Sequence, residues 1–360
     1  MNKYKVCVYA ICKNEEKFVK RWVSSMKEAD NIYVLDTGST DNTVKLLEEN
    51  GCVVKQEIIN PWRFDVARNK SLEMVPEDTT ICVCTDLDEV FLPGWRKKLE
   101  EFWNDNTCKA RYTYNWSLSK DNKPLISFYQ VKIHKRNGYR WTHPVHEVLN
   151  SIDNEKIITI DDITLNHYPD LTKSRSSYLK LLELSVKEDK EDDRNMHYLG
   201  REYMYYKKWN KAIDTLIKHL NLKKATWKDE RCASMRYIAR CYTNLKRYDE
   251  ARMWYDKAIK EGDYLREPYV EKAMLEFSFN NYNEVVILLE EALKITKHEK
   301  TYINEVYSFD STINDLLSIS YYYLNNKTKA LENINKAILL NPEDERLKTN
   351  YKIIENMKEV

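Results

Sequence analysis

Two carboxylates separated by a single residue, Asp86 and Asp88, follow the strand-like run Thr80–Thr85. A mainly apolar run of this length between polar residues is typical of a buried strand in a parallel sheet covered on both faces. Ligands of open α/β sheets bind outside the carboxyl ends of the strands, so we expect a ligand site at these two residues. Carboxylates there suit Mg²⁺ or Mn²⁺, which would bind phosphate oxygens. The alternative is that both residues only cap the turn before a helix at 95–102.

Another acidic residue, Asp36, ends a second predicted strand, Asn31–Asp36. Because parallel strands end at the same edge of a sheet, this recurrence favours a nucleotide crevice over chance capping. The sequence has no GxGxxG motif after its first strand and no GxxxxGK[ST] motif. It therefore predicts neither a dinucleotide-binding Rossmann site nor a P-loop.

Strands and helices alternate along the first half of the chain. The remaining predicted elements are strands Lys5–Ile11 and Cys52–Ile58 and helices 18–26, 44–50 and 64–74. This alternation predicts an α/β fold with a doubly wound parallel sheet. Two strands of alternating pattern then follow, Arg111–Leu118 and Ser127–His134, joined by a turn. They make the predicted sheet mixed but mainly parallel.

From Leu171 onward the pattern is helical throughout, so we expect two domains, 1–170 and 171–360. Four similar segments recur in the second domain, and their small residues stand at steps of 39, 34 and 45: Ala212, Ala251, Val285 and Ala330. Small residues at a helix crossing, with aromatic residues at fixed offsets, match the tetratricopeptide repeat, whose period is about 34 residues. The concave face of such a superhelix usually binds a peptide or a protein. Alternatively, the repeats only support the first domain or form a homodimer.

The composition excludes several classes of partner. Lys and Arg total 58 against 57 Asp and Glu, so no bulk charge points to nucleic acid or to a membrane surface. Eight cysteines without a CxxC pair favour a reducing compartment. No apolar stretch approaches the ~18 residues of a membrane span, and the first apolar run meets charged residues too soon for a signal peptide. We therefore expect a cytoplasmic protein without a membrane span and without a nucleic-acid partner.

Four motifs of the first domain occur in the order VYAICKNEE, VLDTGSTDNT, WRFDVARN and TDLDE. In order and spacing they closely resemble the nucleotide-sugar-binding half of family 2 glycosyltransferases, which have the GT-A fold. The resemblance covers about the first 170 residues. It implies a glycosyltransferase that uses a UDP-sugar, of the UDP-glucose or UDP-N-acetylglucosamine type, together with Mn²⁺ or Mg²⁺.

The resemblance also implies roles for the acidic residues at the strand ends. Asp36 would hold the uracil or ribose end of the UDP-sugar. Asp86 would lie near the ribose and diphosphate, and Asp88 would bind the metal ion. His167, in the segment LNHYP, would be a further metal or diphosphate ligand, and its alternative role is structural.

Four more residues fall on motif positions that line the nucleotide in this family. Asp65 and Arg68 would contact the base and the phosphate. Asn14 and Glu15 would line the nucleotide from the loop after the first strand.

The activated acceptor requires a base, and four of the seven histidines lie between 134 and 167. A lone histidine is more often structural, but four in one segment favour a site. Glu147 is the candidate general base, with His146 as its alternative, because a positioned carboxylate or imidazole can accelerate transfer by ~10² to 10⁴. A thiol acceptor, with a free pKa of about 8.5, would need less help from a base. Both residues could instead only shape the acceptor pocket.

A GT-A domain followed by tetratricopeptide repeats resembles the bacterial peptide glycosyltransferases, including the sublancin-type peptide S-glycosyltransferases that modify a bacteriocin. The resemblance implies transfer of a hexose or N-acetylhexosamine to a Cys, Ser or Thr side chain of a peptide, and we expect single displacement with inversion. The alternatives are a cell-surface saccharide as acceptor, and a catalytically inactive protein that acts only through its repeats.

Overall fold

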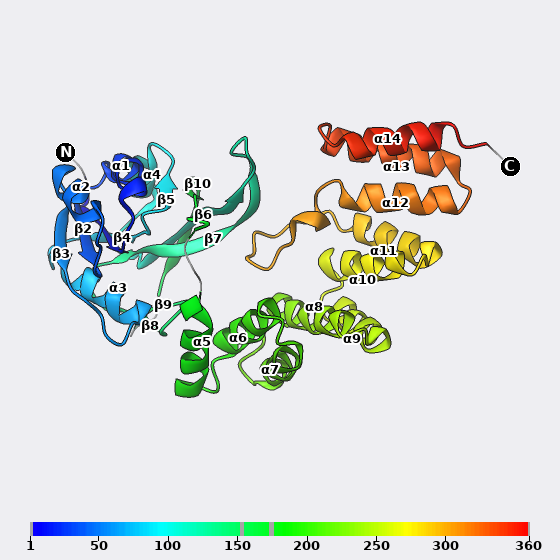
Figure 1. Ribbon diagram of the computed structural model, residues 1–360. Coiled ribbons are helices and arrows are strands. Elements are labelled where there is room, and N and C mark those ends of the chain that lie inside the picture. The colour runs from blue at the N-terminus through cyan, green and yellow to red at the C-terminus, as the bar shows by residue number, and fades with distance from the viewer. Residues whose placement is uncertain (1–2, 152–154, 173–175, 359–360) are drawn as a thin grey trace. The chain divides into compact units, whose positions relative to one another are not determined.

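The computed structural model describes residues 3–151, 155–172 and 176–358. The chain divides into two compact units. The first comprises Met1–Ser185 together with Lys300–Tyr302, and the second comprises Val186–Glu299 and Ile303–Val360. The first unit contains a large sheet and the second consists of helical hairpins (Figure 1).

An eight-stranded sheet in the order β3-β2-β1-β4-β7-β6-β10-β5 forms the first unit. Its strands are β1 (Val6–Cys12), β2 (Asn31–Asp36), β3 (Val53–Gln56), β4 (Ile81–Cys84), β5 (Glu89–Phe91), β6 (Lys109–Leu118), β7 (Pro124–Lys135) and β10 (Ile157–His167). The first four in that order are parallel to one another. Strand β7 is antiparallel to both β4 and β6, and β10 is parallel to β6. The chain direction reverses from β4 to β7 and again from β7 to β6, so β6 and β10 run in the same direction as β4. Strand β10 therefore ends at the same edge of the sheet as β4.

Helices cover both faces of the parallel strands. They are α1 (Glu16–Met26), α2 (Thr43–Glu49), α3 (Phe64–Glu73) and α4 (Trp95–Phe102). Alternate residues of β1 point to opposite faces: Val8 packs in one cluster with Trp22 of α1 and Trp95 of α4, and Tyr9 packs in another with Leu72 of α3. A strand that is buried on both faces must be apolar throughout, which is why β1 carries no alternation in its sequence.

The predicted fold class is confirmed: an α/β part with a mixed, mainly parallel sheet precedes an all-helical part. The bounds of β2 agree with the prediction, and β1 and β4 agree within one residue at each end. Strand β10 was not predicted. Asp161 and Asp162 interrupt its apolar alternation, and the pairing with β6 shifts register between Ile160 and Thr164. The small hairpin β8 (Tyr139–Thr142) and β9 (Val148–Ser151) was also not predicted.

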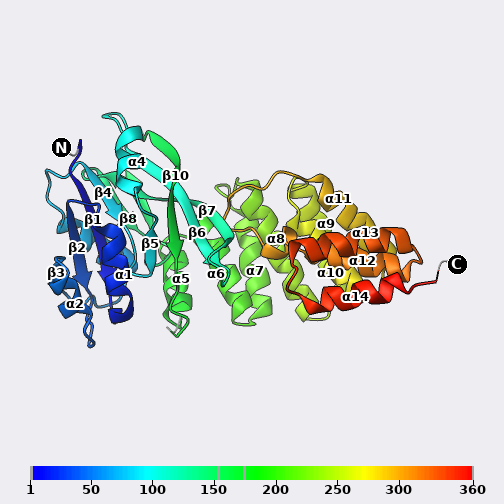
Figure 2. The ribbon, with the colours of Figure 1, turned by 90° about the horizontal axis from the view of Figure 1, so that it is seen from above.

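Four helix pairs build most of the second unit, and successive helices lie side by side in both views (Figures 1 and 2). After α5 (Ser176–Glu188), the pairs are α6 (Asp193–Tyr205) with α7 (Trp209–Asn221), α8 (Lys228–Asn244) with α9 (Tyr248–Glu261), α10 (Glu267–Ser278) with α11 (Tyr282–Lys294), and α12 (Thr312–Tyr323) with α13 (Lys327–Leu340). A short 3₁₀ turn, η1 (Val306–Ser308), precedes α12, and α14 (Glu345–Glu355) ends the unit. Among the described residues, no helix has both the length and the apolar character needed to cross a membrane.

The four pairs repeat the same local geometry. Each turn between the two helices of a pair contains a residue with a φ of 56° to 60°: Lys207, Lys246, Asn280 and Asn325. These positions are separated by the same steps of 39, 34 and 45 as the small residues Ala212, Ala251, Val285 and Ala330, which are fully buried. The register of the four repeats predicted from the small residues is therefore confirmed.

Candidate active site

The carboxyl ends of β1, β2, β4 and β10 meet at one edge of the sheet. Cys12 pairs with Asp36 across the ends of β1 and β2, and the Asp86–Asp88 turn follows β4 directly. His167 ends β10 and pairs with Glu89 of β5. The topology thus brings Cys12 and His167, which are 155 positions apart in the chain, to the same edge.

Asp36 lies beneath a tight turn. Its carboxylate is fully buried and accepts hydrogen bonds from the backbone N–H groups of Gly38 (3.1 Å) and Ser39 (3.0 Å). A φ of 108° at Gly38 lies in the region that L side chains rarely adopt, so glycine suits this turn. Asp36 therefore fixes the shape of the loop at the end of β2.

The loop after β1 is fastened to that turn. The backbone N–H of Asn14 donates to Ser39 Oγ (2.8 Å), and Asn14 Oδ1 accepts from the N–H of Thr40 (2.7 Å). The N–H of Glu15 donates to Thr43 Oγ1 (2.7 Å). The loop with Asn14 and Glu15 is thus bonded to the turn that follows Asp36.

Arg68 of α3 links two of the predicted site residues. Its side chain is only 4% exposed, and Nη2 donates to both carboxylate oxygens of Asp86, at 2.9 and 3.1 Å. Nε of the same guanidinium donates to Glu147 Oε1. Arg68 therefore holds the acid that follows β4 and the candidate base in one charge network.

Lys132 of β7 is a member of this network that sequence reasoning missed. Its Nζ lies 3.0 Å from Asp86 Oδ2 and 3.1 Å from Glu89 Oε1. Burial opposes ionisation of Asp86, but Arg68 and Lys132 outweigh it and hold its pKa well below the ordinary value. Burial raises the pKa of Glu89, and the positive charge of Lys132 offsets only part of this rise. The contact was not predictable, since Lys132 approaches Asp86 only through the antiparallel pairing of β7 with β4.

Asp88 and His167 form a second, adjacent pair. Asp88 Oδ2 lies 3.3 Å from His167 Nε2, and the Asp88 side chain is 25% exposed. His167 Nδ1 lies 3.1 Å from the carbonyl oxygen of Trp116, and because a carbonyl only accepts, Nδ1 carries a proton. Burial opposes protonation of His167, but Asp88 outweighs it and the pKa lies above the ordinary value. The Trp116 ring stacks on His167 at 4.5 Å between centroids and is 44% exposed.

Two of the predicted residues contact partners other than Arg68. Asp65, on α3, accepts from Arg63 Nε (3.0 Å) and Nη2 (2.9 Å). The His146 ring lies 6.0 Å from Tyr178 of α5, centroid to centroid. These contacts of Asp65 and His146 lie outside the network around Arg68.

The grouping of four histidines in one site is wrong for His134. This side chain is fully buried between Tyr9 Oη, 2.8 Å from Nε2, and the carbonyl oxygen of Lys135, 2.6 Å from Nδ1. The indole of Trp141 donates to the same Tyr9 oxygen (2.9 Å). His134 is thus part of a core hydrogen-bond chain, and burial lowers its pKa to about 3.

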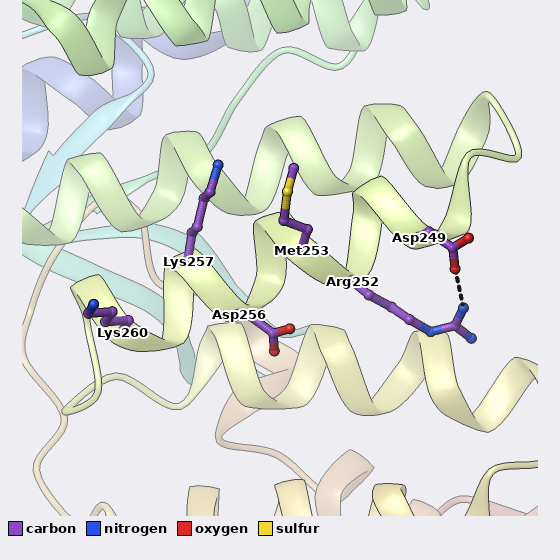
Figure 3. A pocket seen from close by; sticks show the side chains of 6 residues that line it. All are labelled: Asp249, Arg252, Met253, Asp256, Lys257 and Lys260. Atoms are coloured by element: carbon purple, nitrogen blue, oxygen red, sulfur yellow. Dashed lines mark hydrogen bonds and ion pairs between the residues drawn. The ribbon is translucent and has the colours of Figure 1, made fainter.

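The second unit carries an open hollow of about 460 Å³ along α9 (Figure 3). Its lining residues all belong to that helix: Asp249, Arg252, Met253, Asp256, Lys257 and Lys260. Arg252 forms ion pairs with Asp249 (3.3 Å) and with Glu276 of α10 (2.7 Å). The hollow therefore presents a mixed-charge helix surface without a converging set of catalytic groups.

The fold and the strand-end cluster together define an α/β enzyme domain joined to a helical repeat region. The family model described as glycosyl transferase family 2 matches residues 7–162, and the one described as tetratricopeptide repeat matches residues 238–261. The first unit thus contains a glycosyl transferase family 2 domain, and the protein is a glycosyltransferase.

Among curated proteins no match to this chain was found, so the resemblance to the sublancin-type enzymes stays a prediction. Solved structures of repeat proteins resemble about half of the chain. The TPR protein TTC0263 of Thermus thermophilus is 16% identical over 51% of this chain and 91% of its own, with a TM-score of 0.36. YrrB, described as a TPR protein with an unusual peptide-binding site, is 15% identical over 49% and 83%, with a TM-score of 0.37. A TPR repeat-containing protein of Cytophaga hutchinsonii is 13% identical over 50% and 64%, with a TM-score of 0.40.

Proposed function

We propose that this glycosyltransferase moves a hexose or N-acetylhexosamine from a UDP-sugar to a Cys, Ser or Thr side chain of a peptide or protein, with inversion. The observation that carries the proposal is the pair of adjacent clusters at one sheet edge. One joins Asp86 to Glu147 through Arg68, and the other joins Asp88 to His167. The first provides a fixed set of polar groups for the nucleotide and the acceptor, and the second provides ligands for a cation.

The second cluster would offer Mn²⁺ or Mg²⁺ the carboxylate oxygen that these ions prefer, from Asp88, and one nitrogen, from His167. The proton on Nδ1 of His167 leaves Nε2 as the nitrogen that faces Asp88, and the 3.3 Å between Nε2 and Oδ2 is close to the ~3 Å between neighbouring ligands of an octahedral ion with ~2.1 Å bonds. The Trp116 carbonyl is the outer partner that a metal-bound imidazole usually has. When bound, the ion would neutralise charge that develops on the leaving diphosphate. Asp88 and His167 are the residues that would hold it.

The nucleotide would lie along the strand ends of β1, β2 and β4. Asn14, Glu15 and the turn ordered by Asp36 would receive the uridine end. Asp65 would contact the base, and Asp86 would face the ribose and diphosphate, fixed by Arg68 and Lys132. Because this network is ordered by its own ion pairs, its polar groups need little reorganisation when the donor binds.

Glu147 would take the proton of the acceptor. Arg68 engages Oε1 and orients the carboxylate, and the other oxygen would accept the proton as the acceptor attacks the anomeric carbon and the bond to UDP breaks. His146, next in the chain, is the alternative base. A peptide acceptor would dock on the helical repeats, a role supported by the tetratricopeptide match.

The test is transfer from a panel of UDP-sugars to candidate peptides, read by mass spectrometry, with Mn²⁺, with Mg²⁺ and with chelator. At ~4 Å and an effective dielectric of ~20 a unit charge pair is worth about 4 kcal/mol, so Asp88→Asn should lower the rate on the order of a hundredfold or more. Asp78→Asn is the matched control, because that exposed carboxylate pairs with Lys5 before β4 begins.

Each outcome separates one part of the proposal from the rest. If Glu147→Gln transferred sugar to peptide at the full rate, Glu147 would not be the base, and His146 would be the candidate that is left. Transfer to a saccharide and to no peptide would change the acceptor class. An intact protein that neither binds nor hydrolyses any UDP-sugar would refute UDP-sugar as the donor.

A further inference from the structure

A cluster of two histidines and one glutamate lies in the second unit, between the first helix pair and α8. His197 comes from α6, His219 from α7 and Glu230 from α8. One ligand atom from each lies within 4.8 Å of the others, and all three residues are buried, both histidines completely. Three helices thus contribute one metal-binding side chain each to a single interior point.

A serine between the two imidazoles leaves one nitrogen without a proton and without a partner. Ser234 Oγ lies 2.7 Å from His197 Nδ1 and 2.9 Å from His219 Nδ1. One hydroxyl has only one proton, so at least one Nδ1 must carry its own proton, and that neutral ring presents a bare lone pair at Nε2. Within the described residues neither Nε2 makes a hydrogen bond, although His219 Nε2 lies 3.3 Å from Glu230 Oε1. A buried acceptor without a donor destabilises the folded protein, and a bound ion would remove that penalty.

The other repeats show that packing alone does not require these side chains. With the repeat steps of 39, 34 and 45, the position of His219 is occupied by fully buried alanines: Ala258, Ala292 and Ala337. The position of His197 carries Arg236, Val270 and Asp315 in the same order. The first repeat alone among the four has this pair of histidines, and the helices of the other three pack without it.

We propose that His197, His219 and Glu230 form a binding site for a divalent transition metal ion of the Zn²⁺ type. Two imidazole nitrogens and one carboxylate suit Zn²⁺, whereas Mg²⁺ and Mn²⁺ prefer oxygen ligands. The 3.3 Å between His219 Nε2 and Glu230 Oε1 equals the separation of about 3.3 Å that two ~2.05 Å bonds give at a tetrahedral angle. Because no separation in the cluster exceeds 4.8 Å, none has to shorten by more than about 1.5 Å, which is within the reach of side-chain rotation.

Ser234 fits as the outer partner of this site. When both Nε2 atoms bind the ion, both Nδ1 atoms carry protons, and the two lone pairs of the Ser234 hydroxyl accept both of them. Arg201 and Arg236 add positive charge near His197, and nitrogen ligation rather than net negative charge must therefore provide the affinity. The ion would fasten α6, α7 and α8 to one another.

The experiment uses the full chain, stripped with chelator and titrated with Zn²⁺ and, in parallel, with Co²⁺, whose visible absorption reports tetrahedral nitrogen and oxygen ligation. An Asp88→Asn background removes the metal ligand proposed at the sheet edge. The expected result is one Zn²⁺ per chain and a rise in the thermal midpoint on binding. His197→Gln should abolish the Co²⁺ spectrum, and Ser234→Ala should weaken binding about 10- to 100-fold. His298→Gln is the matched control, an exposed histidine of the same unit.

Binding in His197→Gln with the affinity and spectrum of the parent would overturn the site, as would no Zn²⁺ binding by the parent. If His197→Gln fails to fold, judged by its helical circular dichroism, Ser234→Ala and the parent Co²⁺ spectrum decide the question. These readouts do not involve sugar transfer, so the site and the proposed function can fail separately.

Discussion

Both units bury charged side chains, but they do so in different settings. At the sheet edge, Arg68 is 4% exposed while its partner Asp86 is 33% exposed at the side chain. In the helical unit, Arg236 and Glu271 pair at 2.6 Å with side chains 2% and 4% exposed. The first network has a side open to solvent. In the second, the central pair of Arg236 and Glu271 is enclosed between α8 and α10, while Arg240 at its margin is 26% exposed at the side chain.

This difference teaches that buried charge alone does not identify an active site. Glu271 accepts from Arg236, from two nitrogens of Arg240 and from Tyr307, so its oxygens are used within the protein. Within the described part of the chain the Asp88 carboxylate forms one ion pair, with His167, and it is partly exposed at a strand end, where α/β folds bind ligands. We expect the closed network to act on stability and the open one on chemistry.

The largest effect on stability should follow from Glu271→Gln. Removing this charge leaves Arg236 and Arg240 with less compensation in a buried position, and breaking such a pair costs about 3–5 kcal/mol. Urea unfolding should show this loss, whereas Glu332→Gln, which breaks the exposed pair with Lys336, should cost less than about 1 kcal/mol. Sugar-nucleotide hydrolysis by folded Glu271→Gln should equal that of the parent.

The reciprocal variant is Asp88→Asn. Because this acid lies in a partly exposed position, its loss should change the free energy of unfolding by less than about 1 kcal/mol while transfer falls by the hundredfold given above. If Asp88→Asn unfolded as readily as Glu271→Gln, or if Glu271→Gln lost transfer without losing stability, the distinction between the two networks would be wrong.

A smaller effect should follow from Gly200→Ala at the crossing of α6 and α7. A Cβ at this position would lie 2.5 Å from Cδ2 and Cγ of Leu216. The corresponding positions of the other three repeats hold residues that have a Cβ: Ala239, Ala273 and Ser318. Overpacking costs about 1–3 kcal/mol, and the helix propensity of alanine returns about 1 kcal/mol, so the net loss should reach about 2 kcal/mol. Thermal unfolding measures this loss of stability. A variant more stable than the parent would show that α6 and α7 can move apart to admit the methyl group without losing stability.

The elements that could be predicted from the sequence are those marked by a pattern within one short stretch of residues. The buried strands β2 and β4 with their terminal acids, and the four repeats with their small residues, each depend on a contiguous pattern. The sequence could not predict Lys132 beside Asp86, because that contact depends on which strand joins β4. His134 was assigned to a site because only its position along the chain was known, while its side chain points into the core.

The smallest effect, taken per pH unit, concerns acid stability, and the two units should respond alike. Burial lowers the pKa of both His134 in the first unit and His197 in the second to about 3, against about 6.5 in an unfolded chain. Between those values the unfolded chain binds more protons, so stability is lost as the pH falls from about 6.5 towards 3, by up to about 1.4 kcal/mol per pH unit for each ring. Glutamine does not titrate, so His134→Gln should flatten the slope by that amount whatever its effect on stability at pH 7. Urea unfolding at several pH values in the presence of chelator measures the slope, and an unchanged slope in His134→Gln would mean that the ring is accessible to protons in the folded protein.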